Sequence, residues 1–198
     1  MARRLPRPER HRLILDAAVR HFARYGFGGA RTRGIARDCG ITEALLFRHF
    51  PGKKALYRTL LDDRLGRSGR EIYPPYARFK GDDAAFLSFL ASGLLTRMGS
   101  DPHFTRLLLY SALEKHDLAQ GFVDRRVRKS VDYLARWIRK RQREGAFRRV
   151  DPRIAARAFL GMVVHHCLLT HLLGYSVSGK GRDLPRLWAE LFLSGVRS

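Results

Sequence analysis

The sequence contains little cysteine and no long apolar run, and both absences exclude classes of protein. Cys39 and Cys167 are the only cysteines among its 198 residues. Two isolated cysteines, both within apolar helical patterns, indicate neither a disulfide framework nor a zinc site and are typical of a reducing cytosol. No run approaches the roughly eighteen apolar residues of a membrane span, and no apolar stretch follows the basic segment MARRLPRPERHR as a secretory signal requires. We therefore expect a soluble, cytoplasmic protein without a membrane partner.

Acidic residues are scarce relative to basic ones. Lys and Arg number 39 against 18 Asp and Glu, which gives a formal net charge of +21. Residues 1–58 carry 14 basic and 4 acidic side chains, while the remaining 140 residues carry 25 and 14, so the N-terminal part has about twice the net charge per residue. Such a surface attracts polyanions and favours nucleic acid as a partner. A merely solvated basic surface is the alternative.

Strict alternation of apolar and polar residues, which marks half-buried strands, is missing as well. Apolar residues instead recur at helical spacing along nearly the whole chain. Asp101-Pro102 and Asp151-Pro152 each place a capping residue before a proline at the first helical position. We expect an all-α protein of about nine helices, at about 9–25, 32–39, 42–49, from 53, 83–98, from 102, up to 145, 152–174 and 184–196.

Two short helices are expected at 32–39 and 42–49, joined by a turn at Gly40 and braced by the first helix. Thr42 suits the N-cap of the second one, because its hydroxyl can accept a hydrogen bond from a free backbone amide. This is the geometry of a helix-turn-helix, whose second helix can reach base edges in the major groove. A helical hairpin with no DNA role remains the alternative. The small core of the motif would come from Ile35, Ala36, Ile41, Leu46 and Phe50.

Between Arg12 and Leu60 the chain carries an Ile-Leu-x-Ala-Ala helix ending in Phe and Gly, then Ile-Ala, Gly, an aromatic residue, His-Phe, and Lys before a Leu. The residues are Ile14, Leu15, Ala17, Ala18, Phe22, Gly26, Ile35, Ala36, Gly40, Phe47, His49, Phe50, Lys53 and Leu56. This stretch closely resembles the DNA-binding domain of the TetR family of bacterial regulators. The resemblance implies a three-helix DNA-binding head at 1–55, with its motif at about 31–50, and a larger helical regulatory and dimerisation domain at 56–198.

The resemblance also implies nine DNA contacts. They are Thr32 and Arg33 at the start of the second helix, Thr42, Glu43, Ala44 and Leu45 at the front of the recognition helix, Phe47 and His49 against phosphate and sugar, and Lys53 on a phosphate.

Several of these positions depart from the family pattern. Phe47 replaces the usual tyrosine and lacks its hydroxyl, whereas Glu43 could accept a hydrogen bond from a cytosine amino group. Leu45 could contact a thymine methyl group. Ala30 and Arg31 stand where threonine or serine is frequent, which weakens the expected cap of the second helix.

For the rest of the chain the resemblance implies a homodimer through the last two helices and repression at a palindromic operator that a small molecule relieves. The residues support the dimer, because apolar and small side chains such as Ala158 and Gly161 cover more than one side of the helix expected at 152–174. The candidate ligand contacts are Phe86, Leu90, Leu94, Arg106, Tyr110, Phe122 and Trp137. Ligand cavities are mostly apolar with few polar anchors, so we expect a mainly hydrophobic effector. An ordinary packed core is the alternative.

Other functions have weaker support. His165, His166 and His171 lack the spacing of three or four residues that brings helical side chains together, so we expect no metal. No nucleophile motif, Gly-rich phosphate loop or paired carboxylate frame occurs, so we expect neither an enzyme nor a cofactor. The basic run at 125–143 is interpreted as a solvated face, with a site for an acidic ligand as the alternative. A non-specific, nucleoid-type DNA binder without an effector is the remaining rival.

Overall fold

The computed structural model describes residues 6–67, 73–113, 121, 127–175 and 183–197. In these ranges the chain forms nine α-helices and one short 3₁₀ helix, with no strand beyond an isolated bridge between Phe147 and Arg197. The expected all-α fold class is therefore confirmed. The chain divides into two compact units, made of residues 1–69 with 103–121 and of residues 70–102 with 122–198. We call them the first unit and the second unit.

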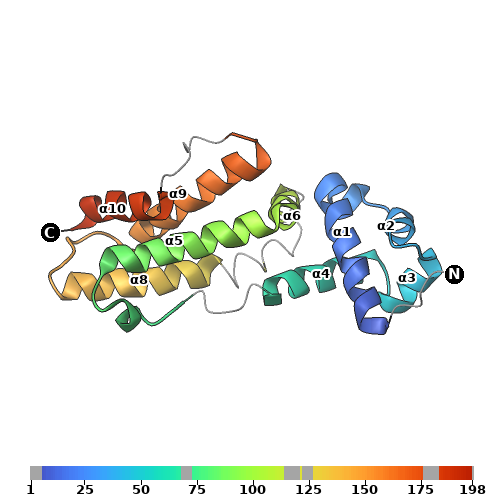
Figure 1. Cartoon of the computed structure of the whole chain (residues 1–198), viewed down its shortest axis with the longest axis horizontal. Coiled ribbons are helices and arrows are strands. Elements are labelled where there is room, and N and C mark those ends of the chain that lie inside the picture. The colour runs from blue at the N-terminus through green and yellow to red at the C-terminus, as the bar shows by residue number, and fades with distance from the viewer. Residues whose placement is uncertain (1–5, 68–72, 114–120, 122–126, 176–182, 198) are drawn as a thin grey trace. The chain divides into compact units, whose positions relative to one another are not determined.

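Five helices form the first unit, and Figure 1 shows the first four of them at the N-terminal end of the chain. They are α1 (Arg7–Gly29), α2 (Thr32–Asp38), α3 (Glu43–His49), α4 (Lys53–Arg67) and α6 (Pro102–Leu113). The helix α6 belongs here although it lies far along the chain, because Leu107 is fully buried in the same apolar core. That core includes Ile14, Leu15, Ala18 and Phe22 from α1, Ile35 and Ala36 from α2, Leu46 from α3, and Leu56, Tyr57 and Leu60 from α4.

Two details of the first unit differ from the sequence-based expectation. Gly26 adopts φ 68°, a left-handed conformation that glycine tolerates, and interrupts α1 there. The helix then resumes and ends at Gly29 instead of ending near Tyr25. The compact unit also extends beyond residue 55, because α4 buries Leu56, Tyr57 and Leu60 against α1.

Four α-helices and the 3₁₀ helix η1 form the second unit, and the α-helices lie alongside one another in Figure 1. They are η1 (Tyr76–Phe79), α5 (Asp83–Ser100), α8 (Arg128–Arg143), α9 (Pro152–Leu172) and α10 (Leu184–Val196). Aspartates cap three of them: Asp82 accepts from Ala85 N at 2.9 Å, Asp151 from Ile154 N at 2.8 Å, and Asp183 from Arg186 N at 3.2 Å. Each cap stabilises its helix by about 1 kcal/mol.

The core of the second unit is rich in aromatic side chains. Phe86 and Trp137 are buried with ring centroids 4.8 Å apart, and Phe147 meets Trp137 edge-on at 5.2 Å. Beside this cluster the buried carboxylate of Asp83 accepts from the Tyr76 hydroxyl at 2.6 Å and from Arg141 Nη2 at 3.1 Å. The ion pair compensates the burial of both charges and fixes α5 against α8.

Among the described residues one helix, α9, is long and apolar enough by length and composition to cross a membrane, although two arginines and three histidines interrupt it. It buries Ala156, Phe159, Val163 and Cys167, which belong to the core of the second unit. These four residues anchor α9 in the core; among its other apolar residues Leu160 and Met162 are half-buried against that core, and Ile154 and Ala158 are exposed.

Candidate DNA-binding interface

The helices α2 and α3 form the expected helix-turn-helix. Gly40 takes φ 62° in the turn, where a residue with a side chain is disfavoured. Thr42 is the N-cap of α3, and its hydroxyl accepts a hydrogen bond from Leu45 N at 3.2 Å, which confirms the cap expected from the sequence. Ile35, Ala36, Leu46 and Phe50 are buried as expected, and Ile41 is half-buried.

The outward face of α3 is made by Ala44, Phe47 and Arg48. These positions are spaced by three and four residues and share one helix face, and all three side chains are exposed, Phe47 by 42%. Leu45 is half-buried beside them, and Leu46 points into the core. An exposed phenylalanine next to a cation, on a helix whose cap is also exposed, is a surface available to a partner.

A hydrogen bond joins the first turns of the two motif helices. Thr32 Oγ1 at the start of α2 donates to Glu43 Oε1 at the start of α3, at 2.5 Å. Arg31, the N-cap of α2, makes no side-chain cap bond, as its identity predicts. The hydrogen bond from Thr32 to Glu43 therefore helps to fix this end of α2 where a side-chain cap is missing. It also fixes the direction of the Glu43 carboxylate at the front of the recognition helix.

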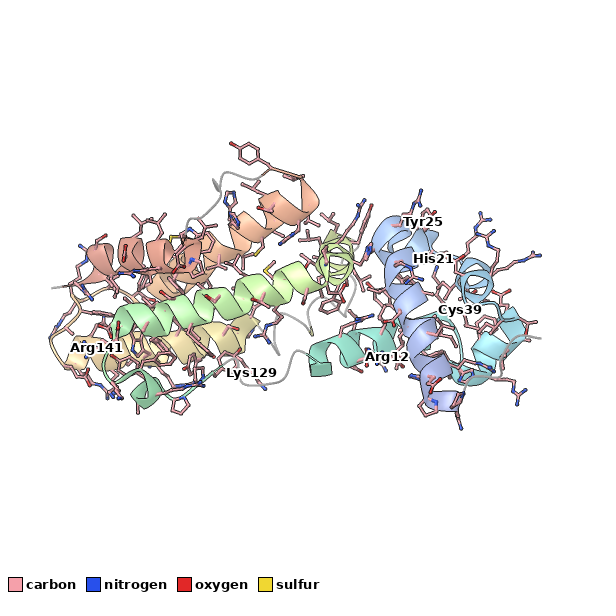
Figure 2. The ribbon with its side chains drawn as sticks, in the orientation of Figure 1. Arg12, His21, Tyr25, Cys39, Lys129 and Arg141 are labelled. Carbon is pink, nitrogen blue, oxygen red and sulfur yellow. The ribbon has the colours of Figure 1, made fainter. Side chains whose placement is uncertain are left out.

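A second polar link joins α1 to the end of α2, and sequence analysis did not anticipate it. His21 Nε2 and Asp38 Oδ2 are 2.8 Å apart, and the hydrogen bond from His21 holds the pKa of the Asp38 carboxyl below its usual range. A Cβ at Gly34 would lie 2.9 Å from Cε1 of the same imidazole, so α2 approaches α1 closely at this point. Figure 2 labels His21 and Tyr25 on α1.

Lys53 opens α4 and is held by the end of α1. Its Nζ donates to the carbonyl oxygen of Gly28 at 3.1 Å and lies 4.9 Å from the centroid of the Phe27 ring. These contacts restrict the side chain to one region. A cation that is pre-positioned at a helix N-terminus suits a phosphate, which is the role expected for Lys53.

His49 ends α3 in an electropositive surrounding. Burial, followed by the positive charge of Arg7, His11, Arg10 and Arg48, lowers the pKa of its imidazole. Within the described residues its Nδ1 is buried without a hydrogen-bond partner. The ring is therefore neutral at physiological pH, and it can still donate one N–H bond to a phosphate or sugar oxygen.

Arg48 is an exposed cation of the recognition helix that the sequence-based assignment omitted. The family pattern fixes Phe47 and His49 on either side of it and is silent about this position. The spacing from Ala44 to Arg48 would have placed it on the outward face. The remaining predicted contacts, Arg33 and Thr42, are both exposed, as a role at a surface requires.

The predicted ligand contacts do not form one group. Phe86, Leu90 and Trp137 are buried in the core of the second unit, and Leu94 packs against them from a half-buried position. Arg106 and Tyr110 lie on α6 in the first unit, where the guanidinium is 5.8 Å from the tyrosine ring. Phe122 lies outside the described residues, as do Arg125 and Arg126 of the basic run.

An apolar groove of about 420 Å³ follows α9 and α10 of the second unit. Its lining includes Ile154, Ala158, Met162, Leu191, Phe192 and Gly195. Ile154 and Leu191 are exposed by 69% and 56%, which is unusual for large aliphatic side chains that face water.

The three histidines of α9 have separate surroundings. His166 packs edge-on against Trp188 at 5.3 Å, and burial lowers the pKa of its imidazole. His171 lies next to Gly99, and His165 is exposed. Within the described residues, no three His, Cys, Asp or Glu side chains are grouped to hold a metal ion.

Comparisons with known proteins match both parts of the chain. Residues 14–60 match the model of bacterial regulatory proteins of the tetR family, and residues 87–186 match the C-terminal domain of AefR-like transcriptional repressors. The transcriptional regulator RutR of Escherichia coli K12 is 38% identical over 73 residues, which cover 34% of each chain. The chain thus matches only about a third of the length of this curated relative.

Solved structures share the fold over nearly the whole chain. A TetR-like regulator from Rhodococcus sp. RHA1 superposes with a TM-score of 0.75 at 22% identity, covering 97% of this chain and all of that one. The fatty acid degradation regulator FadR from Bacillus halodurans gives a TM-score of 0.68 at 18% identity, with 97% and 98% covered. The helix-turn-helix geometry, both family models and these neighbours agree, and the chain belongs to the TetR family of bacterial regulatory proteins.

Proposed function

We propose that this protein is a homodimeric repressor that binds a palindromic operator and leaves it when a small hydrophobic effector binds the second unit. Members of the TetR family are DNA-binding transcriptional regulators, typically repressors, and are not enzymes. They bind small-molecule effectors and act as dimers. Because regulators of this family act on DNA, we infer that this protein works in the cytoplasm.

The observation that carries the DNA-binding proposal is the construction of α3. A helix of seven residues is too short to be stable by itself, yet its outward face of Ala44, Phe47 and Arg48 is fixed by the Thr42 cap and the Thr32–Glu43 bond. A surface held this firmly and left exposed is suited to reading base edges, because recognition requires donors and acceptors at fixed positions.

The dimer proposal depends on the exposed face of α9. Ile154, Ala158, Gly161 and His165 follow one another at spacings of four, three and four residues, all are exposed, and none carries a fixed charge. Ile154 and Ala158, together with Leu191 of α10, line the groove, and Gly161 and His165 continue the same helix face beyond it. Small residues at such positions let helices from two protomers approach closely, and burying the apolar face supplies the driving force.

The dimer is tested by sedimentation of Gly161→Phe. Apart from the glycine's chain neighbours and the adjacent helix backbone, no described atom of the protomer lies within 4 Å of a Cβ at this position. A larger side chain should therefore disturb a second chain more than its own. We expect dissociation into folded monomers. Gly161→Ala adds only a methyl group, is the matched control, and should remain a dimer. A wild-type protein that sediments as a folded monomer at micromolar concentration contradicts the proposal.

The operator is tested by selecting sequences from a random duplex library with the full-length protein. We expect a two-fold symmetric motif whose half-sites lie roughly 34–36 Å apart, one turn of DNA. The rival, a non-specific nucleoid-type binder, predicts equal affinity for selected and random duplexes. A specific protein prefers its operator by a factor of about 10³ or more.

The effector proposal rests on the aromatic cluster of the second unit. Because Phe86 and Trp137 are in contact, a hydrophobic molecule must separate these rings to enter, so binding should change Trp137 emission and raise the unfolding temperature. A panel of apolar compounds, screened by both signals and then for release from the selected operator, tests this step. No response across the panel leaves the second unit as a dimerisation module.

A further inference from the structure

The helix α8 presents a stripe of exposed cations that the functions above do not use. Lys129, Arg136, Lys140 and Arg143 are exposed and follow one another at spacings of seven, four and three residues. At 100° per residue they fall within about 60° of one helix face and extend over about 21 Å. Arg139 borders the same face. We call these five residues the α8 stripe; Figure 2 labels Lys129 and Arg141 near opposite ends of the helix.

The acids near the stripe are already engaged elsewhere. Asp132 Oδ1 accepts from Arg153 Nη2 of α9 at 2.5 Å. Glu144 accepts from Arg141 Nη1 at 2.6 Å and lies 3.7 Å from Lys140.

Four members of the stripe consequently keep an uncompensated charge. Within the described part of the chain, Lys129, Arg136, Arg139 and Arg143 have no carboxylate partner.

Helix stability does not explain this arrangement. Cations in the last turn, such as Arg143, interact favourably with the negative end of the helix dipole, but Lys129 lies in the first turn, where the interaction is unfavourable. The pairs Arg136–Lys140 and Arg139–Arg143 place like charges four residues apart, which also destabilises a helix. The stripe is therefore better explained by a polyanionic partner than by the fold.

The chemistry of the stripe selects duplex DNA among polyanions. A helix that binds a lipid surface needs an exposed apolar face, whereas the apolar face of α8, with Leu134, Trp137 and Ile138, is buried in the core. Duplex DNA carries one negative charge per about 1.7 Å, so a stripe about 21 Å long lies beside about a dozen phosphates. Binding there releases condensed counterions without requiring any base contact.

We propose that the α8 stripe is a second, sequence-independent contact surface for the backbone of duplex DNA. It lies in a different compact unit from the helix-turn-helix. The protein then binds DNA in two ways, with bases read in the first unit and charge matched in the second. The inference does not depend on the effector or on the identity of the operator.

The test uses the full-length protein with Lys129→Gln, Arg136→Gln, Arg139→Gln and Arg143→Gln combined, and a random-sequence duplex as the probe. Removing four phosphate contacts per chain should lower the slope of log K against log salt by about 3 to 4. At low salt the affinity should fall by at least tenfold. The motif selected from a random library should stay the same, because the stripe reads no bases.

Matched variants separate a local contact from total charge. Arg136→Gln with Arg139→Gln removes two charges from the stripe, and Arg157→Gln with Arg197→Gln removes two exposed charges elsewhere in the same unit. The first pair should lower the salt slope and the second should not. Arg136→Lys with Arg139→Lys keeps the charge and should bind as the wild type does.

Photo-crosslinking locates the contact directly. A photoreactive residue introduced at Arg136 should crosslink to the random duplex, and the same residue at Arg157 should not. The proposal is overturned if both pairs of Gln variants weaken binding equally, or if position 136 gives no crosslink. A quadruple Gln variant that loses affinity for phosphatidylglycerol vesicles but not for DNA would overturn the proposal in favour of a lipid partner.

Discussion

The two compact units differ in how much the orientation of their helices depends on polar links. In the first unit, acidic side chains link neighbouring helices at the surface: Asp16 binds Arg64 of α4, Asp38 binds His21 of α1, and Glu43 binds Thr32 of α2. In the second unit, α5, α8, α9 and α10 have 13 to 21 residues and enclose an aromatic core, and ion pairs join α5 to α8 and α8 to α9. The helices α2 and α3 of the first unit have only seven residues each and bury too little surface to fix their own orientation, so directional polar bonds contribute more there.

The two units also display positive charge differently. The recognition helix α3 exposes a single Arg48 within a face defined by its cap and by Glu43. The helix α8 exposes a row of cations, and the one acid among them, Asp132, is paired with Arg153 of α9. Base reading depends on where each group points, and backbone attraction depends on how many charges are present. The difference suggests that precision and affinity for DNA are supplied by separate parts of this chain.

The largest effect is expected from replacing a large buried side chain in the core of one unit at a time. Phe22 is fully buried in the first unit, and its ring meets that of Tyr57 edge-on with centroids 4.8 Å apart. The substitution Phe22→Ala should therefore lower the free energy of unfolding of this unit by about 3–5 kcal/mol. Both tryptophans, Trp137 and Trp188, belong to the second unit. We expect hydrogen exchange in α1–α4 to accelerate and DNA binding to be lost, while the unfolding midpoint reported by tryptophan emission stays unchanged.

The corresponding experiment in the second unit is Phe159→Ala, which removes a buried ring from its core. It should lower the tryptophan-reported midpoint by a comparable amount and leave exchange in α1–α4 near the wild-type rate. If both signals shift together in both variants, the chain unfolds as one cooperative body, and the division into two independently stabilised units is wrong.

Glu43→Gln addresses base reading and has the next largest expected effect. The amide keeps the size of the side chain but replaces one acceptor oxygen by a donor NH2 group and removes the negative charge that strengthens a hydrogen bond from a cytosine amino group. One base pair of the operator should therefore lose about 1–3 kcal/mol of discrimination. Selection from a random duplex library measures the change. Thr32→Val removes the hydrogen bond from Thr32 to Glu43 and leaves the carboxylate, and an identical altered motif would assign the effect to the positioning of that carboxylate. An unchanged motif for Glu43→Gln removes this residue from the reading face.

Lys53→Ala should have a smaller and uniform effect. A phosphate contact contributes equally to every sequence, so the affinity for operator and for random duplexes should fall by the same factor, and the salt slope by about 1 per chain. The control is Lys54→Ala, which removes an exposed lysine one residue further along α4. It should change the affinity and the salt slope less than Lys53→Ala does. A change in the selected motif for Lys53→Ala would contradict a purely phosphate-binding role and would mean that Lys53 influences base reading.

The periodicity of apolar residues, together with capping residues, prolines and glycines at helix ends, predicted most of the fold. Asp151 and Thr42 cap helices as expected because a cap depends only on residues within one turn. The interruption at Gly26 was misplaced because the sequence marks a glycine without saying whether the helix resumes after it. The 3₁₀ helix Tyr76–Phe79 has no counterpart in the prediction, since four residues carry too little periodicity to be recognised.

The resemblance predicted which positions form the candidate site, but it did not predict the hydrogen bonds between their side chains. The hydrogen bonds between Thr32 and Glu43 and between His21 and Asp38 join residues 11 and 17 positions apart. Nothing in a linear pattern pairs such residues, because the pairing depends on how the helices cross. For the same reason, the six predicted ligand contacts that the structure describes divide between the two units.

The smallest effect concerns alkaline pH and should appear in the second unit alone. Burial, reinforced for Tyr76 by its bond to Asp83, raises the pKa of Tyr76 and of Tyr133 to about 12. A phenol pKa raised in the folded state stabilises the protein fully below the unfolded value of 10, and this contribution is lost as the pH rises from 10 to 12. Tyr76→Phe with Tyr133→Phe should therefore flatten the fall of the tryptophan-reported midpoint across that window, even though the variant starts from lower stability at neutral pH. Tyr25→Phe, on the exposed side of α1, should leave the curve unchanged. An equally steep fall in the double variant would assign the alkaline limb to lysine deprotonation and not to these two phenols.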